Sequence, residues 1–138
     1  MTIVKISGIF SFAVAAAFLI AATDAVAQET ASKNSDKGKF VVSYTTELKP
    51  LTINKIHDWI VHVESADGTL IDDATITLVG GMPVHDHGLP TLPLATLNLG
   101  DGDYLVEGMK FHMNGWWQVM LSIVSGDDSD SVTFDLQL

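Results

Sequence analysis

The sequence predicts an all-β protein, an antiparallel β-sandwich of about seven strands. Apolar and polar residues alternate along short segments, which is the pattern of strands with one buried face. Turn signals rich in glycine and aspartate separate these segments at regular intervals, as in sandwiches. Beyond the N-terminal segment, no stretch carries a sustained apolar stripe with helical spacing. Long helices are therefore not expected.

Seven segments fit the strand pattern, and the last two show the clearest alternation. A glycine-aspartate-glycine turn at residues 100–102 lies just before Tyr104. A tyrosine in this position is typical of the tyrosine corner of immunoglobulin-like sandwiches, so we expect that version of the fold. The seven expected strands lie within residues 40–46, 54–65, 74–79, 92–99, 104–107, 117–123 and 132–138.

Composition excludes several classes of partner. The 138 residues carry a net charge of −10 and contain no arginine. A surface of this sign does not suit nucleic acid or anionic lipid head groups, which need dense positive charge. Cysteine is absent, so no disulfide and no thiolate ligand can form. Any soft metal ligand has to be a methionine.

The N-terminus has the features of a secretory signal peptide. Lys5 precedes an apolar run over residues 9–22, and the sequence Ala-Val-Ala at 25–27 fits a cleavage site before Gln28. A retained anchor is the alternative, but the run is shorter than the roughly 20 residues of a typical span. We expect a signal peptide at 1–27, a flexible lead-in at 28–38 and the sandwich domain at 39–138. The mature protein would be periplasmic or secreted, not an integral membrane protein.

The segment from Gly80 to Pro90 interrupts the strand pattern and concentrates metal-binding side chains. His85 and His87 are two residues apart, which in an extended chain places both imidazoles on one side. Paired neutral imidazoles bind copper, zinc or nickel. Met82 adds a thioether, and Asp86 is a candidate hydrogen-bond partner for a ligating imidazole. The alternative is a surface loop whose histidines only form hydrogen bonds.

A second stretch, residues 108–117, carries further donors. In an extended chain Met109 and Met113 lie on one side and His112 on the other. Methionine is usually core filler, but loops at one end of a sandwich cluster, so this stretch is expected near the first. Imidazoles with thioethers suit copper better than zinc. The predicted metal ligands are Met82, His85, His87, Met109, His112 and Met113.

Other polar residues are interpreted as structural. His57 and His62 lie on one expected strand without other ligand types nearby in sequence, so packing or surface roles are expected. Asp127, Asp128 and Asp130 lack the spacing of a calcium-binding loop, and a solvated turn is the expected structure.

Three motifs stand out in the chain: Met82-Pro83-x-His85-x-His87-Gly88-Leu89-Pro90-Thr91, Gly102-x-Tyr104 and Phe111-x-Met113-x-Gly115-x-Trp117. Together they resemble the YtkA-like/FixH-like group of secreted domains. The likeness extends from about residue 54 to the C-terminus. The resemblance implies an immunoglobulin-like sandwich that occurs in copper handling and haem-copper oxidase assembly, with Met82, His85, His87 and Met113 at its functional end. FixH proteins keep a membrane anchor, whereas the cleavage site here argues for release.

The expected function is that of an exported protein that binds copper and buffers it or delivers it to another periplasmic or membrane protein. Two alternatives stay open. One is a non-catalytic, metal-free module that binds a partner during respiratory-complex assembly. The other is a small-molecule binder using the Trp116–Trp117 end. An enzyme is not expected, because the sequence has no nucleophile elbow, reactive cysteine, zinc-protease motif or phosphate loop.

Overall fold

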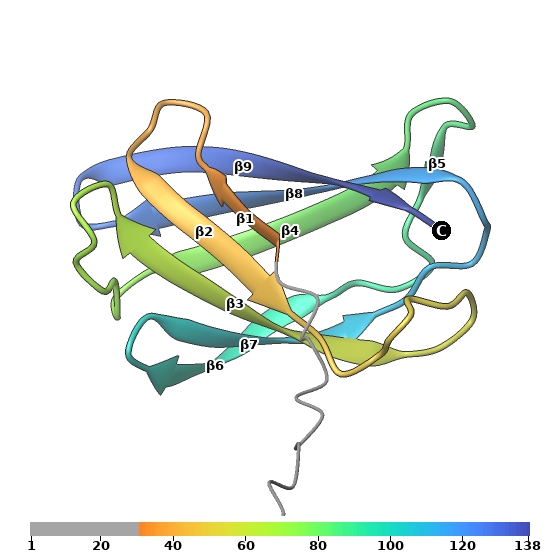
Figure 1. Ribbon diagram of the computed structural model, residues 1–138, viewed down its shortest axis with the longest axis horizontal. Coiled ribbons are helices and arrows are strands. Elements are labelled where there is room, and N and C mark those ends of the chain that lie inside the picture. The colour runs from red at the N-terminus through yellow and green to blue at the C-terminus, as the bar shows by residue number, and fades with distance from the viewer. Residues whose placement is uncertain (1–30) are drawn as a thin grey trace, which may run out of the picture.

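A computed structural model describes residues 31–138, and over this range the chain is all-β. Two antiparallel sheets pack face to face (Figure 1). The predicted β-sandwich is therefore confirmed, with nine strands rather than about seven. The strands are β1 (Ala31–Asn34), β2 (Phe40–Thr45), β3 (His57–Ser65), β4 (Thr75–Met82), β5 (His87–Gly88), β6 (Leu94–Gly100), β7 (Asp103–Met109), β8 (Trp116–Ser125) and β9 (Asp128–Gln137).

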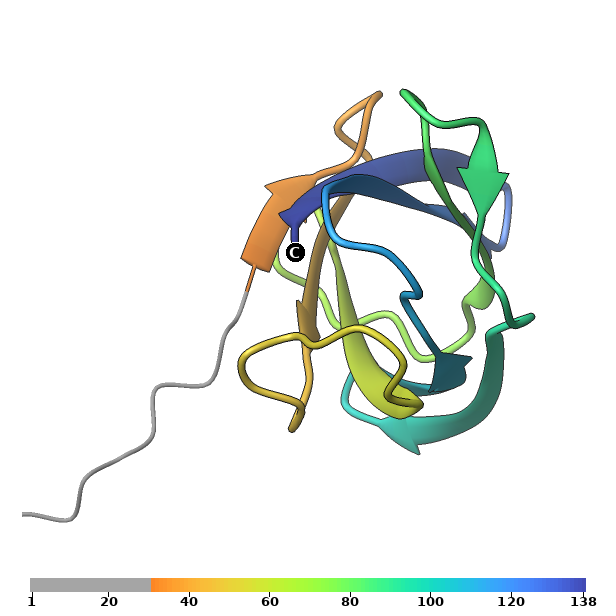
Figure 2. The same ribbon diagram turned by 90° about the vertical axis from the view of Figure 1, so that its right-hand side faces the viewer.

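The sheets contain five and four strands. The five-stranded sheet has the order β1-β2-β3-β7-β6, and the four-stranded sheet has the order β5-β4-β8-β9. Each of the seven predicted segments overlaps one of the strands β2, β3, β4, β6, β7, β8 or β9, and five of these strands extend beyond the predicted bounds. The view in Figure 2 shows β1 beside the end of β9 on one side, and β5 leading into β6 on the other. The edges of the two sheets therefore meet along two seams. One seam lies between β1 and β9, and the other lies between β4 and β6.

The inner faces of both sheets form one apolar core. Alternate residues of β3 and β8 are fully buried, among them Trp59 and Trp117, as the sequence alternation predicted. Tyr44 stacks on Trp59 with ring centroids 3.9 Å apart. The Tyr104 hydroxyl donates a hydrogen bond to the carbonyl of Ile71 and accepts one from the Ala74 amide. This bridge ties the β3–β4 connection to β7 over 30 and 33 positions of sequence, whereas the hydroxyl of a tyrosine corner bonds the backbone a few residues upstream.

The predicted flexible lead-in at 28–38 is wrong for the part that the structure describes. Residues 31–34 form β1, which pairs with β2 from Ala31 opposite Tyr44 to Asn34 opposite Val41. Alternation could not reveal this strand, because its polar side chains are mostly exposed and backbone pairing alone places it. The predicted signal peptide at 1–27 lies outside the described residues. Among residues 31–138, no helix is long and apolar enough to cross a membrane.

Candidate metal site

The hairpin of β4 and β5 carries the first predicted group of ligands. Met82 pairs with His87, and residues 83–86 form the turn between them. The His85 amide donates a hydrogen bond to the Met82 carbonyl over 3.0 Å, and Asp86 has a φ of 52°. The segment is therefore a tight turn and not an extended chain. The two-residue spacing of His85 and His87 does not place their rings on one face of a strand.

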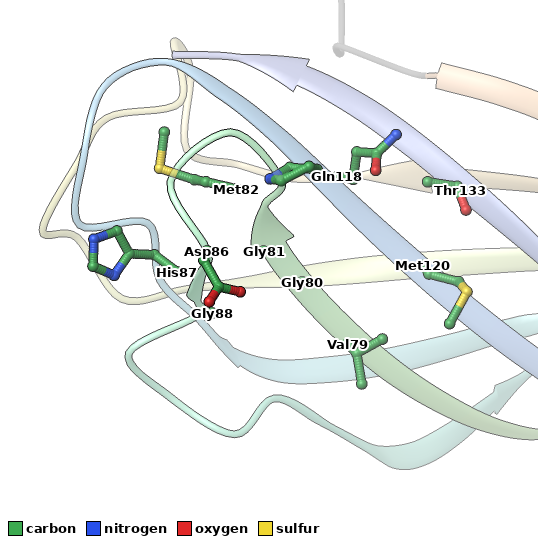
Figure 3. A pocket seen from close by; sticks show the side chains of 11 residues that line it. Val79, Gly80, Gly81, Met82, Asp86, His87, Gly88, Gln118, Met120 and Thr133 are labelled. Atoms are coloured by element: carbon green, nitrogen blue, oxygen red, sulfur yellow. The ribbon is translucent and has the colours of Figure 1, made fainter.

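The hairpin separates its polar side chains into two groups. Residues directly opposite in an antiparallel pair share a face, so His87 lies on the same side as the buried Met82. Figure 3 shows the carboxylate of Asp86 pointing away from the ring of His87, toward the outer side where Val79 and Met120 lie. Asp86 is thus not placed as the partner of this imidazole. His85 is exposed on the turn.

The loop at 110–115 carries the second group and passes from the five-stranded to the four-stranded sheet. Hydrogen bonds hold it at three points. Gly115 and Leu138 exchange a pair of 2.9 and 3.0 Å, and the Asn54 amide donates to the Phe111 carbonyl over 2.7 Å. The indole Nε1 of Trp117 donates to the carbonyl of Met113 over 3.0 Å. The loop is therefore held against the four-stranded sheet and against the β2–β3 connection.

The two groups meet at this end of the sandwich. The rings of His87 and His112 lie edge to face, with centroids 5.9 Å apart and an interplanar angle of 84°. His112 also packs on the indole of Trp117 at 5.4 Å. Its Nδ1 is buried and has no hydrogen-bond partner among the described residues. A nitrogen in this state is unusual, because buried polar atoms are generally paired.

Met82 contacts the same loop at Gly115. A Cβ built on Gly115 would lie 2.9 Å from the Met82 Cε, so a side chain at this position would push the end of Met82 aside. Gly115 has a φ of 129°, which side-chain-bearing residues rarely adopt. Met82 is 1 % exposed, and Met113 is half-buried against the core. The thioether of Met82 thus borders the loop that carries His112.

Not every predicted ligand joins this cluster. Met109 is completely buried at the end of β7, opposite His57, and acts as core filler. Within residues 31–138, no three His, Cys, Asp or Glu side chains group closely enough to hold a metal ion by themselves. The donor set at this end is therefore imidazole and thioether. The sequence did not reveal Gly115 as the contact of Met82, although a glycine between His112 and Trp117 was a visible signal.

Comparison with known proteins identifies the family. The YtkA-like family matches residues 32–122, about two thirds of the chain. The chain belongs to the YtkA-like family. Among solved structures, the ZirS C-terminal domain is similar over 99 % of this chain and 88 % of that one, with 12 % identity and a TM-score of 0.44. No curated protein matches the sequence. The YtkA-like match includes the β4–β5 hairpin and the 110–115 loop, so the candidate site lies within the family domain.

Proposed function

We propose that this YtkA-like protein is exported and binds copper at the end of the sandwich where His87 meets His112. The thioethers of Met82 and Met113 complete the proposed donor set. The observation that carries the proposal is the edge-to-face approach of two imidazoles from segments 25 positions apart in the chain. Metal–nitrogen bonds of about 2.0 Å put the centroids of two imidazoles on one ion roughly 5 to 6 Å apart. The 5.9 Å between these rings fits that requirement.

The nature of the donors favours copper over other ions. Soft thioethers select copper, whereas calcium and magnesium need several oxygen ligands. Zinc sites in proteins are built mainly from thiolates, imidazoles and carboxylates. The chain has no cysteine, and no carboxylate cluster joins the two rings in the described part of the chain. The buried Nδ1 of His112 has no hydrogen-bond partner within residues 31–138, and in the tautomer protonated at Nε2 it offers a lone pair to an ion.

The burial pattern supports a transfer or buffering role. Met82 is buried, His112 is half-buried and His87 is exposed. An ion held here would therefore have one ligand accessible from solvent, where an accepting protein could replace it. We propose a non-catalytic role in the periplasm, with delivery to another periplasmic or membrane protein.

Competition titrations with cuprous, cupric and zinc ions test the proposal. We expect the mature protein to bind copper more tightly than zinc, and to lose at least tenfold in copper affinity when His87→Ala and His112→Ala are combined. His85→Ala is the matched control, because His85 is exposed on the same turn without facing His112; its affinity should change less than threefold. Copper affinity that survives the double substitution, or is weaker than micromolar in the wild type, contradicts the proposal.

A metal-free partner-binding module in respiratory-complex assembly is the second candidate. It is favoured by the exposed leucines of β6, which lie outside the proposed metal site. This function predicts a complex that a copper chelator does not dissociate. It also predicts that the His87→Ala and His112→Ala pair leaves complex formation unchanged.

A further inference from the structure

One indole, that of Trp117, contacts three consecutive residues of the 110–115 loop. Its ring lies edge to face with the ring of Phe111, with centroids 5.2 Å apart, and with the ring of His112 at 5.4 Å. Its Nε1 donates a hydrogen bond to the carbonyl of Met113 over 3.0 Å. His112 and Met113 belong to the proposed donor set. A single side chain therefore contacts both donors that this loop supplies.

Trp117 itself has a fixed place in the fold. Its side chain is completely buried, and β8 lies between β4 and β9 in the four-stranded sheet. The residue pairs with Leu136 of β9. Close packing of a protein interior holds a large side chain of this kind in one rotamer. The indole is thus anchored in the sheet, whereas the residues that it contacts belong to a loop.

The ring of His112 lacks the hydrogen bond that usually orients a metal-binding imidazole. Such an imidazole generally donates its second N–H to a carbonyl or a carboxylate, which fixes the orientation of the ring. Among the residues that the structure describes, none forms a hydrogen bond with the His112 ring, and its Nδ1 is buried. Packing is the remaining constraint, and the rings of Trp117 and His87 supply it.

We propose that Trp117 is the positioning residue of the copper site, an inference that rests on the proposed function. The indole holds the His112 ring by edge-to-face packing and the Met113 backbone by the Nε1 hydrogen bond, so both donors are in place before an ion binds. A site that is ordered in advance loses less conformational freedom on binding and therefore binds more tightly. Trp117 acts through these two residues and is not a ligand, because its Nε1 is only a donor.

Trp59 provides the comparison with an ordinary core residue. It is also completely buried, it stacks on Tyr44, and its Nε1 has no hydrogen-bond partner between residues 31 and 138. Replacing either tryptophan by phenylalanine removes the same atoms from the same core. Only the substitution of Trp117 also removes a hydrogen bond and ring contacts to the 110–115 loop. Trp59→Phe is therefore the matched control.

Copper titrations of the mature protein test the proposal. Trp117→Phe should lower copper affinity about fivefold or more, because a phenyl ring cannot donate to Met113 and presents a smaller edge to His112. Trp59→Phe should change the affinity by less than about twofold. In the His112→Ala background the effect of Trp117→Phe should shrink to about twofold, since only the bond to Met113 is left to lose. An effect of full size in both backgrounds overturns the proposal, because a general loss of core packing would give that result.

A second measurement uses the metal-free protein and does not depend on copper. NMR signals of the His112 ring and of the amides of residues 110–114 should be single and narrow in the wild type and in Trp59→Phe. In Trp117→Phe the same signals should be split or broadened, because the loop is released from the indole. Split or broadened signals of the His112 ring in the wild type overturn the proposal, whatever the variants do.

The outcomes separate this inference from the copper proposal. If the wild type binds copper and Trp117→Phe binds it as tightly as Trp59→Phe, the positioning role alone is overturned. If the wild type does not bind copper, the proposed function fails and the positioning role fails with it, even where the metal-free loop is ordered by Trp117.

Discussion

The two seams of the sandwich are closed by different kinds of interaction. At the β1–β9 seam, the Asp36 amide bonds the Ser131 carbonyl, Lys33 Nζ bonds the Thr133 carbonyl, and the Ser35 hydroxyl bonds buried Asp130. At the β4–β6 seam, the edges are separated by a leucine-lined hollow. Hydrogen bonds and charges fix the first seam, while apolar side chains line most of the hollow at the second. The difference suggests that polar groups stabilise the fold mainly at the β1–β9 seam.

The largest expected effect on stability is that of Gly115→Ala, at the end of the sandwich that carries the proposed copper site. Gly115→Ala places a Cβ against the Met82 methyl group and forces a side chain into a φ of 129°. We expect a loss of about 2 to 3 kcal/mol in the free energy of unfolding, because strained backbone costs roughly 1 to 3 kcal/mol before the clash is counted. Copper affinity should fall at the same time, since Met82 is displaced.

Gly126→Ala is the control for this substitution. Gly126 also has a positive φ, of 55°, but an added Cβ meets nothing within 4 Å. Its cost should be about 1 kcal/mol, from the backbone alone. Urea unfolding of both variants and copper titration of both give the comparison. If Gly115→Ala behaves like Gly126→Ala in both measurements, the Met82 contact does not shape the site.

The next largest effect on stability is expected from Ser35→Ala, which removes hydrogen bonds at the β1–β9 seam. Ser35 is 4 % exposed; its hydroxyl donates to Asp130 over 2.5 Å and accepts from the Phe40 amide over 2.9 Å. Ser35→Ala leaves both partners unsatisfied in a buried position, and we expect a loss of about 1 to 3 kcal/mol. Thr96→Ala, at an exposed position of β6 on the β4–β6 seam, should change stability by less than about 0.5 kcal/mol. Equal effects would remove the distinction between the seams.

The sequence predicted the seven longer strands but missed the two short strands β1 and β5. Alternation located the seven longer strands because each buries one face in the core. It missed β5, which has two residues and is placed by the hairpin, and β1, which is placed by pairing with β2. The prediction that Asp130 lies in a solvated turn was also wrong, because its carboxylate is buried between β9 and the β1–β2 connection. These features depend on partners distant in sequence.

The candidate site was predicted in composition but not in arrangement. Residue types and spacing singled out the two stretches at 80–90 and 108–117. The clustering of loops at one end of a sandwich predicted that these stretches meet. The extended geometry assumed for His85 and His87 is wrong, because residues 83–86 form a turn. Only the topology, with a hairpin in one sheet and a loop crossing between the sheets, brings His112 rather than His85 to His87.

The contribution of the β1–β9 seam to stability should also depend on pH, through Asp130. Burial raises the pKa of Asp130, but hydrogen bonds from the Ser35 hydroxyl and from the backbone amides of residues 131, 39 and 37 have a larger effect in the opposite direction. The net result is a pKa lowered to about 2. The folded value is below the ordinary 3.8, so this carboxylate stabilises the fold above pH 3.8. That contribution is lost as the pH falls through about 2.

Asp130→Asn should therefore unfold more readily than the wild type at neutral pH, with the difference shrinking in acid. Thermal unfolding midpoints measured between about pH 7 and pH 2 give the comparison. Asp128→Asn is the control, because Asp128 is exposed and its salt bridge to Lys39 lies on the surface, where such pairs contribute little. A constant difference between wild type and Asp130→Asn across this range would contradict the assignment.

The smallest expected effect comes from two histidines of β3, which lies between the seams in the five-stranded sheet. Burial lowers the pKa of His62, but hydrogen bonds to Asp103 and Glu64 outweigh it, so the net shift is upward. Burial also lowers the pKa of His57, and there the bond to the Lys55 carbonyl does not compensate, so the net shift is downward. The two rings should therefore make opposite contributions to the pH dependence of stability.

His62 stabilises the fold below pH 6.5, and this contribution is lost as the pH rises through its raised pKa. His57 has the reverse effect, because its stabilising neutral form is lost as the pH falls through its lowered pKa. Each contribution should be a few tenths of a kcal/mol, since both rings are partly exposed and solvent screens them. Unfolding free energies of His62→Gln and His57→Gln, each subtracted from the wild type between about pH 5 and 8, should have slopes of opposite sign. Slopes of the same sign would contradict the assignment, because they would mean that Asp103 and Glu64 do not stabilise the protonated ring of His62.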